Sequence, residues 1–333
     1  MSVAWLRNRS AFWNILKVLF AMILFGFVFS KTELHRLPAL FESISIRWLI
    51  FSTFLFLSLT LLKALQYYAL VREKVTYAQV LNVVILQNAV SNYLASSAGI
   101  ASYLTLFRME HDVKVSRSLI TFLLVKMGDL IVLWPALFFS SLLVWSHIGA
   151  IKDITIGLLF GIGAVILVLI FTLIFRRRFI LFLNSILTWS RFPQIQIIRK
   201  ALDALQTFSE VELGKLSGRL TLVFLFSVGY FALSVFWYYS TFMVFNFHMD
   251  ISPLVFTNVL IQLISYFPIQ VFGGLGVTET GSLFLWEQFG VGQSVLAPIL
   301  VGSRILFYII NLIPLIYLSV HAIFLGKSTT DGE

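Results

Sequence analysis

The sequence predicts an all-α polytopic membrane protein, and two observations support this prediction. Of the 333 residues, 59% are hydrophobic and only 12% are charged, whereas soluble domains carry about 25% charged residues. Apolar runs of about 20 residues, each long enough to cross a hydrocarbon core of roughly 30 Å, recur along the whole length. We therefore expect one integral membrane domain, residues 1–333, with about six full transmembrane helices and two oppositely oriented re-entrant helical hairpins.

The first half of the predicted domain comprises residues 1–175. Its expected transmembrane helices are residues 11–30, 48–71, 118–145 and 154–175. Between them, residues 77–107 are apolar but carry Asn88, Asn92 and several serines at their centre, and basic residues flank both ends. A segment that begins and ends on the positively charged side of a membrane is expected to be a re-entrant hairpin.

The second half, residues 220–327, follows a less apolar linker, residues 176–219, that carries many basic residues. The linker has apolar residues at helical spacing, namely Ile198, Leu202, Leu205 and Phe208. This spacing predicts an amphipathic helix on the cytoplasmic surface, although a plain solvated linker fits equally well. The expected transmembrane helices of this half are residues 220–245 and 294–325, with the second hairpin, residues 252–289, between them and a short polar tail, residues 328–333, after them.

The distribution of charge sets the expected orientation. The net charge of +9 would suggest nucleic acid in a soluble protein, but membrane proteins accumulate Lys and Arg in cytoplasmic loops. With the N-terminus in the cytoplasm, the external loops contain only four basic residues, Lys31, Arg36, Arg47 and Lys152. We therefore expect a multi-pass protein of the cell membrane, with both termini in the cytoplasm and no nucleic-acid partner.

Residues Pro268–Glu279 form the most unusual stretch of the chain. Gly273, Gly274 and Gly276 follow the proline, and a carboxylate, Glu279, ends the stretch between two apolar arms. Glycine and proline break helices, and broken backbone at membrane depth is tolerated only where protein buries it or where it lines a cavity. This stretch is therefore the first candidate for a functional site.

The two predicted hairpins enter from opposite sides, which is typical of an inverted repeat. Each is followed by a long helix with a buried cation, Lys126 in the first half and Arg304 in the second. Gly99 precedes Lys126 by nearly the same distance as Gly276 precedes Arg304. Such repeats occur in transporters, because exchanging the conformations of the halves exchanges access between the two sides. Chance similarity between two apolar sequences is the alternative.

Ionisable residues within a membrane are costly and need a partner or a function. Glu279 is expected to cap the helix that follows it, to pair with Arg304, or to hold a cationic headgroup or a proton. Lys126 and Arg304 would suit a phosphate shared by both access states, although Asp129, one turn after Lys126, could simply neutralise it. Lys63 is expected to extend its ammonium group to the cytoplasmic surface.

Polar amides and aromatic residues have less specific interpretations. Asn92 and the other hairpin amides either line a polar path or satisfy freed backbone groups. Aromatic residues make up 16% of the chain, and we expect them to face lipid or the core, with Trp and Tyr at the membrane interfaces.

Several kinds of chemistry lack a signal in the sequence. There is no cysteine, which excludes disulfides and thiol chemistry. No zinc-ligand spacing, nucleophile elbow or phosphate-binding loop is present, and the glycines after Pro268 lack the strand-to-helix context of a nucleotide site. We therefore predict no metal, no cofactor and no catalytic residue. The predicted substrate-binding residues are Asn92, Lys126, Asp129, Gly273, Gly274, Gly276, Glu279 and Arg304.

These residues resemble the flippase-like family typified by the membrane half of lysylphosphatidylglycerol synthases. The resemblance extends roughly from Leu49 to Leu325. The segment Pro268–Val291, with its Gly-Gly-x-Gly, Glu279 and a later Gly-Val, is similar to the second motif of the family. Arg304, followed by Ile-Leu-Phe-Tyr, resembles the last helix of the family.

The first half resembles the family less closely. Asn92-Tyr-Leu and Lys126-x-x-Asp129 are similar to its asparagine-containing hairpin and its Arg-x-x-Asp helix. The Pro-Gly and Glu of the first hairpin motif are replaced here by Ser96–Ser102. The cytosolic aminoacyl-transfer domain of the synthases has no counterpart, so the resemblance implies lipid movement rather than lipid aminoacylation. Relatives without that domain are associated with glycolipid or polyprenyl-linked glycan pathways.

We predict a lipid translocase, not an enzyme, that moves an anionic phospholipid or a lipid-linked sugar such as a polyprenyl-linked glycolipid across the cytoplasmic membrane. The alternatives are an integral membrane glycosyltransferase and a non-transporting membrane partner of a glycosyltransferase. A transferase would need a paired acid and base or a metal site. The only other acid on the arm of Glu279 is Glu287, about two helical turns further on.

Overall fold

The computed structural model consists of helices throughout the part of the chain that it describes, which is residues 3–32, 37–111, 113, 115–175, 177–189, 205–206, 213–266 and 270–328. The α-helices are α1 (Val3–Ser30), α2 (Leu37–Glu42), α3 (Ile46–Val71), α4 (Tyr77–Tyr93), α5 (Ser96–His111), α6 (Val115–Leu143), α7 (Lys152–Phe175), α8 (Arg177–Trp189), α10 (Leu213–Met243), α11 (Ile251–Ser265), α12 (Val277–Glu287) and α13 (Gln293–Ser328). Two short 3-10 helices are η2 (Gly149–Ile151) and η4 (Phe272–Gly274). The all-α prediction is confirmed.

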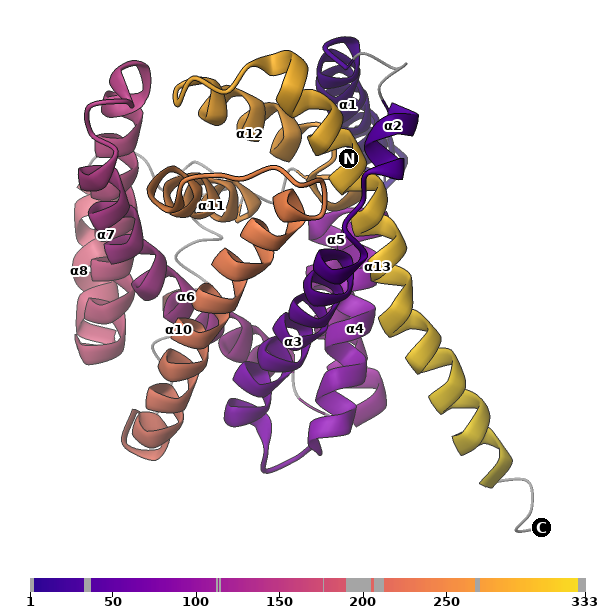
Figure 1. Cartoon of the computed structure of the whole chain (residues 1–333). Helices are drawn as coiled ribbons and strands as arrows, with labels where there is room; N and C mark the ends of the chain where they lie inside the picture. The colour runs from indigo at the N-terminus through magenta and orange to yellow at the C-terminus, as the bar shows by residue number, and fades with distance from the viewer. Residues whose placement is uncertain are drawn as a thin grey trace.

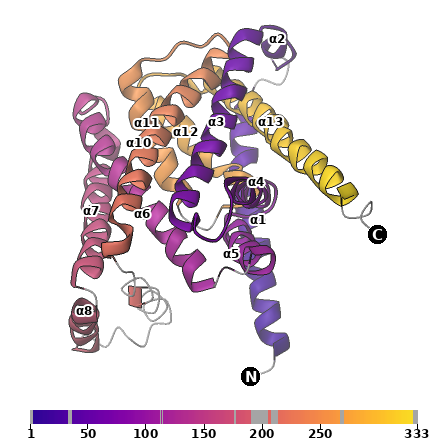
Figure 2. The same cartoon turned by 90° about the horizontal axis from the view of Figure 1, so that it is seen from below.

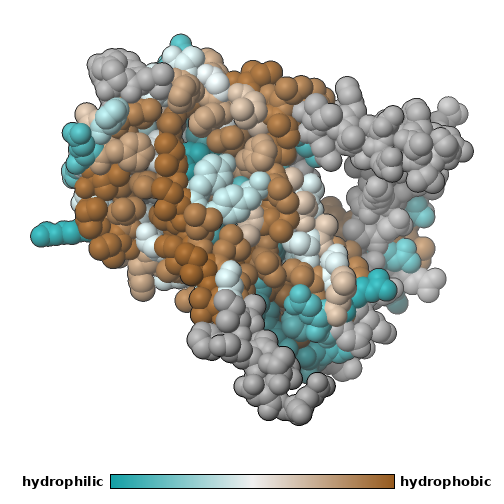
Figure 3. Space-filling model, turned by 90° about the vertical axis from the view of Figure 1, so that its right-hand side faces the viewer, coloured by the Kyte–Doolittle hydropathy of each residue, from teal (hydrophilic) through white to brown (hydrophobic). Residues whose placement is uncertain are grey.

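Five helices in the described chain, α3, α6, α7, α10 and α13, are long and apolar enough to cross a membrane. The sixth expected helix corresponds to α1, which is continuous over 28 residues and has its apolar part at Leu16–Ser30. Large apolar side chains are exposed on several of these helices; Phe160, for example, is 75% exposed. The face of the molecule seen in Figure 3 is largely hydrophobic, as lipid contact requires. The prediction of a polytopic membrane protein is confirmed.

Both predicted hairpins are present as pairs of short helices. The helices α4 and α5 pack against each other and are joined by a turn at Leu94 and Ala95, whereas α11 and α12 are joined through η4 and lie side by side in Figure 1. Gly99 lies inside α5 rather than at the turn, and a side chain there would clash with Ser91 and with the carbonyl of Gln87 on α4. This glycine therefore serves helix packing. The re-entrant orientation and the inverted repeat stay predictions.

Three buried apolar clusters hold the helices together. The first surrounds α3, the α4–α5 hairpin and α6, with the rings of Tyr67 and Tyr103 4.8 Å apart. The second connects α1, α10, α12 and α13 around Phe242 and Trp286, and the third lies between α6 and α11. The most extensive contact between two helices joins α3 to α10 (Figure 1). The first hairpin thus packs into the first cluster and the second hairpin into the other two, and the α3–α10 pair connects the first cluster to the second.

The linker between the halves is described only in part. Helix α8 follows α7 closely, and the ring of Phe179 stacks on that of Phe171 at 5.6 Å. Figure 2 shows α8 at the end of α7, to one side of the molecule. The predicted amphipathic helix lies outside the described residues except at Leu205, and so does the polar tail except at Ser328.

An arginine pair clamps the turn between α3 and α4. The carboxylate of Glu73 accepts a 2.9 Å hydrogen bond from Arg117, at the start of α6, and another from Arg219 of α10. On α4, Thr76 and Gln79 form a capping box. The hydrogen bonds from Arg219 and then from Arg117 lower the pKa of Glu73 to about 2. The carboxylate joins three segments at the side assigned to the cytoplasm.

The stabilising effect of Glu73 is expected to disappear in acid. Its pKa in the folded protein lies below the ordinary value of 4.5, so folding favours the ionised form. The contribution should be complete above pH 4.5 and should be lost as the pH falls toward 2. Thermal melting in detergent should therefore show a Tm difference between wild type and Glu73→Gln that shrinks over this window. Glu110→Gln, on the exposed side of α5, is the control; a pH-independent difference for Glu73→Gln would contradict the assignment.

Gly276 lies where α1 crosses the start of α12. Its φ is +80°, and a Cβ there would meet the carbonyl oxygen of Ala21 and the amide of Phe25 in α1. Nearby, the hydroxyl of Thr280 donates to the carbonyl of Leu24 at 3.3 Å. The absence of a side chain thus serves both the positive φ and the close approach of α1.

Replacing this glycine should destabilise the protein. Gly276→Ala should cost roughly 2 kcal/mol or more, from the positive φ together with the clash against α1. Gly161→Ala in α7, where nothing lies within 4 Å of the added carbon, is the matched control and should not lower Tm. Equal Tm values for the two variants in a detergent melt would show that α1 does not pack here.

Candidate functional site

The tips of the two hairpins meet at backbone level. An isolated antiparallel bridge pairs Ala95, in the turn of the first hairpin, with Val271, just before η4 of the second. On either side of the bridge, the amide of Ser96 donates to the carbonyl of Gln270 at 3.1 Å and the amide of Phe272 donates to the carbonyl of Leu94 at 2.9 Å. Gly273 has a φ of +64°, and a Cβ there would lie 3.3 Å from the backbone of Asn92. The glycine turn therefore allows the two broken helices to touch.

A buried ion pair holds the glycine turn. Glu279, in the first turn of α12, accepts the amide of Gly276 at 2.6 Å and the Nε of Arg304 at 2.5 Å. The guanidinium also donates to the carbonyl of Gly273 at 3.0 Å and to the hydroxyl of Thr278. The side chains of Arg304 and Glu279 are 9% and 6% exposed. The predicted pairing and the predicted cap are both confirmed, and one carboxylate provides them.

Helix α13 contributes two further residues to the junction of the hairpins. The hydroxyl of Tyr308 donates to the carbonyl of Phe272 at 2.6 Å, and that of Tyr93 donates to the carbonyl of Tyr308 at 2.8 Å. The amide of Asn92 donates to Asn311 at 2.6 Å. Tyr308 and Asn311 were not predicted for the site. They lie about one and two helical turns after Arg304, and this spacing indicates that they share its face of α13.

A second buried ion pair lies in the first half. Asp129 accepts a 2.8 Å hydrogen bond from Lys63, and its other oxygen accepts from Gln66 at 3.0 Å and from Ser227 at 3.1 Å. The expectation that Lys63 reaches for the cytoplasmic surface is wrong, because a buried carboxylate on α6 faces it directly. The hydrogen-bonded ion pair of Asp129 is made with Lys63 and not with Lys126.

Lys126 has aromatic neighbours. Its ammonium lies 4.3 Å from the ring centre of Tyr266 and 5.8 Å from that of Phe122, distances at which a cation is attracted by a ring face. Among the residues that the structure describes, no carboxylate forms an ion pair with Lys126.

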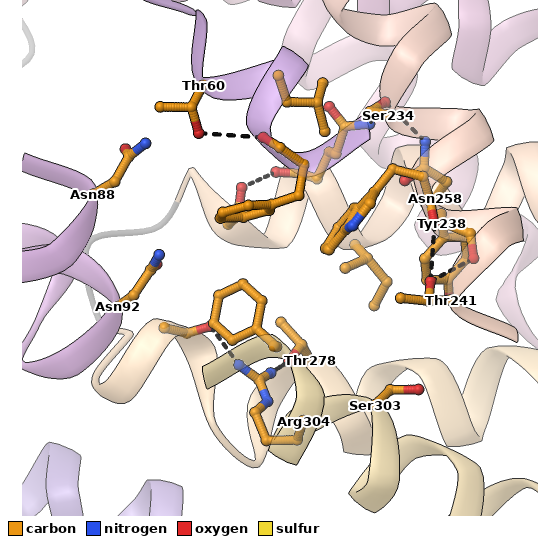
Figure 4. A pocket seen from close by; sticks show the side chains of 18 of the residues that line it. Thr60, Asn88, Asn92, Ser234, Tyr238, Thr241, Asn258, Thr278, Ser303 and Arg304 are labelled. Atoms are coloured by element: carbon orange, nitrogen blue, oxygen red, sulfur yellow. Dashed lines mark hydrogen bonds between the residues drawn. The ribbon is translucent and has the colours of Figure 1, made fainter. Parts of the chain in front are cut away.

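A cavity of about 390 Å³ lies between α3, α4, α6, α10, α11, α12 and α13. Five of the predicted site residues line it, namely Asn92, Lys126, Gly273, Glu279 and Arg304. The remaining three, Asp129, Gly274 and Gly276, are not in its lining. Asn88 and Asn92 point from α4 toward the open space, with Arg304 and Thr278 on one side of it (Figure 4). The volume falls within the range of small-molecule sites.

Aromatic side chains form much of the cavity wall. They include Phe56, Tyr67, Tyr230, Trp237, Tyr238 and Phe307. Tyr67, Tyr230, Trp237 and Tyr238 therefore face the cavity, because α3 and α10 turn them inward; their depth in the membrane stays a prediction. The hydroxyl of Ser303 also lines the cavity and is buried without a hydrogen-bond partner within the described chain. Among the residues that the structure describes, no group of three or more His, Asp or Glu side chains is placed to hold a metal ion.

These features define a class of protein, the helical membrane proteins with a charged cavity among their helices. The chain belongs to the lysylphosphatidylglycerol synthase TM region family, whose model matches residues 14–314. Both hairpins, both ion pairs and the whole cavity lie within that match. No curated protein and no solved structure matches the chain. The predicted membership of this family is confirmed.

Breaking the Glu279–Arg304 pair should be costly. Glu279→Gln leaves the guanidinium buried beside an uncharged partner, for which we expect a loss of about 3–5 kcal/mol. Glu287→Gln, at the exposed end of the same helix, should change stability by less than about 1 kcal/mol.

A double-variant cycle measures the coupling between the two residues. Glu279→Gln combined with Arg304→Gln should recover part of the loss, because no unpaired charge remains. Denaturant or thermal unfolding in detergent provides the measurement. If the two single losses simply add, the ion pair is not what holds the turn.

Proposed function

We propose that this protein is a lipid translocase, which moves the polar headgroup of a phospholipid or of a polyprenyl-linked glycolipid across the cytoplasmic membrane. One observation carries the proposal: a charged, amide-lined cavity lies inside a bundle of membrane-spanning helices, where the tips of two broken hairpins meet. A polar headgroup does not enter hydrocarbon without cost, and such a cavity replaces its water with protein donors and acceptors.

The lining of the cavity suits an amphipathic ligand. The ammonium of Lys126 favours a phosphate, while the amides of Asn88 and Asn92 can hydrogen-bond to further headgroup oxygens. The buried hydroxyl of Ser303, which has no partner within the described residues, would gain one from a ligand. The exposed apolar outer surfaces of the helices leave the acyl or polyprenyl chains free to remain in lipid.

Three further arguments support the proposal. The family to which the chain belongs is named for a membrane region of lipid-modifying synthases, which fits a lipid substrate. The bias of Lys and Arg toward one set of loops supports a location in the cell membrane with both termini in the cytoplasm. Hairpins of opposite orientation would allow the cavity to open alternately to the two sides.

A membrane glycosyltransferase is the alternative that shares the same ligand. Acid–base chemistry requires a side chain, often a carboxylate, that is free to exchange a proton with the substrate. Glu279 is the carboxylate of the described cavity lining, and its two oxygens are engaged by Gly276, Thr278 and Arg304. This arrangement favours binding over catalysis.

Reconstitution in liposomes tests the proposal. Lipids with a fluorescent acyl chain and different headgroups are placed in both leaflets, and a membrane-impermeant quencher measures their exchange. We expect exchange with wild type and a loss of about tenfold or more with Ser303→Ala combined with Asn92→Leu, which removes two polar groups from the wall. Ser319→Ala, at an exposed position of α13, is the control. No exchange of any lipid would reject the translocase, and sugar transfer from an added donor would favour the glycosyltransferase.

A further inference from the structure

The charges around the cavity do not balance. Its lining holds three cations, Lys63, Lys126 and Arg304, and one carboxylate, Glu279. A second carboxylate, Asp129, lies behind the wall and pairs with Lys63 at 2.8 Å. Each carboxylate is matched to one cation, which leaves a single positive charge on Lys126.

Arg304 already donates hydrogen bonds to groups of the protein itself. Its Nε and both terminal nitrogens donate to Glu279, to the carbonyl of Gly273 and to Thr278. A phosphate could engage it only by displacing contacts that hold the glycine turn. The ammonium of Lys126 has three donors and lies against the rings of Tyr266 and Phe122. Asp129 and Lys63 are near enough to interact with it electrostatically, but within the described chain the carboxylate of Asp129 forms its ion pair with Lys63.

We infer that Lys126 selects the headgroup by charge, and that the cavity is matched to one net negative charge: a phosphodiester without a cationic group, rather than a net-neutral zwitterionic phosphodiester or a diphosphate. Arg304 is then a positioning residue. A monoanion at Lys126 brings the net charge of the buried site to zero, whereas a zwitterion leaves it positive and a diphosphate makes it negative. An uncompensated charge is costly at membrane depth. This inference rests on the proposed function, because it names the substrate class of the same site.

The surroundings of Lys126 suit a phosphodiester. The amides of Asn88 and Gln262 also line the cavity, and amide N–H groups can donate to the second unesterified oxygen. Tyr67 and Tyr230 form part of the same wall. The rings of Tyr266 and Phe122, which lie against the ammonium of Lys126, restrict water around it, which strengthens its attraction for an anion.

The test compares three lipids with the same fluorescent acyl chain: phosphatidylcholine (net charge zero), phosphatidylglycerol (one negative charge) and diacylglycerol diphosphate (at least two). Binding is measured as the rise in Tm of the detergent-solubilised protein, and movement is measured by exchange in liposomes. Wild type should prefer phosphatidylglycerol in both assays. Lys126→Gln should weaken the binding of phosphatidylglycerol about tenfold or more and leave that of phosphatidylcholine unchanged.

Two controls separate charge selection from general damage. Lys152→Gln removes a cation that also lies over an aromatic ring, Trp145 at 5.1 Å, but outside the cavity, and it should preserve the preference. Arg304→Lys should reduce Tm and exchange for all three lipids alike without changing their order.

A gain-of-charge variant gives the opposite test. Asn88→Lys adds a second free cation to the lining and should shift the preference toward the diphosphate lipid. The inference is overturned if Lys126→Gln keeps the wild-type order, or if Arg304→Lys changes the order while Lys126→Gln does not. Absence of exchange with wild type would reject the translocase, while the order of binding in the Tm assay would still decide the role of Lys126.

Discussion

The structure depends on how one stretch of non-helical backbone is satisfied inside the bundle. Unpaired peptide groups at membrane depth cost several kcal/mol each, and the turn around Gly273 interrupts the regular helical pattern. Arg304 donates to a carbonyl of this turn while it pairs with Glu279, and Glu279 caps the helix that follows. The ion pair therefore stabilises broken backbone in place of the helical hydrogen bonds. The stabilised turn and the ion pair form one wall of the cavity, so the position of the cavity depends on this turn.

Much of the fold could be predicted from the sequence, because hydrophobic length and helix-breaking residues are local signals. The expected spanning helices and both hairpins correspond to observed elements, although α1 and α10 begin seven or eight residues earlier than expected and the short helix α2 was not expected. The pairing of Glu279 with Arg304 was one of the expected alternatives, because a buried charge needs a partner. The partner of Asp129 could not be found, because Lys63 lies 66 residues away in the sequence and only the packing of α3 beside α6 brings the two together. The aromatic wall was missed for a similar reason: composition does not say which face of α3 or α10 turns inward.

The two buried ion pairs have different structural roles. In the second half, the pair is built into the turn and fixes its shape. In the first half, Lys63 and Asp129 lie on long helices, α3 and α6, away from the turn at Ala95, and connect those helices through Gln66 and Ser227 of α10. Two buried pairs that look alike in composition thus stabilise a loop in one case and a helix junction in the other. The charged residues in the sequence do not show which of these two roles a buried ion pair has.

The backbone bridge between Ala95 and Val271, with hydrogen bonds on either side of it, also bears on how far the two hairpins can differ in sequence. A junction made of main-chain groups is indifferent to the side chains that flank it, provided that the backbone keeps its shape and Gly273 leaves room. The first hairpin has serines and small residues at Ser96–Ser102, without the proline and carboxylate of the second, and it still meets the second hairpin. Because a joint of this kind depends only on main-chain shape, substitutions along the first hairpin can change the lining of the cavity while the mechanical connection between the two hairpins is kept.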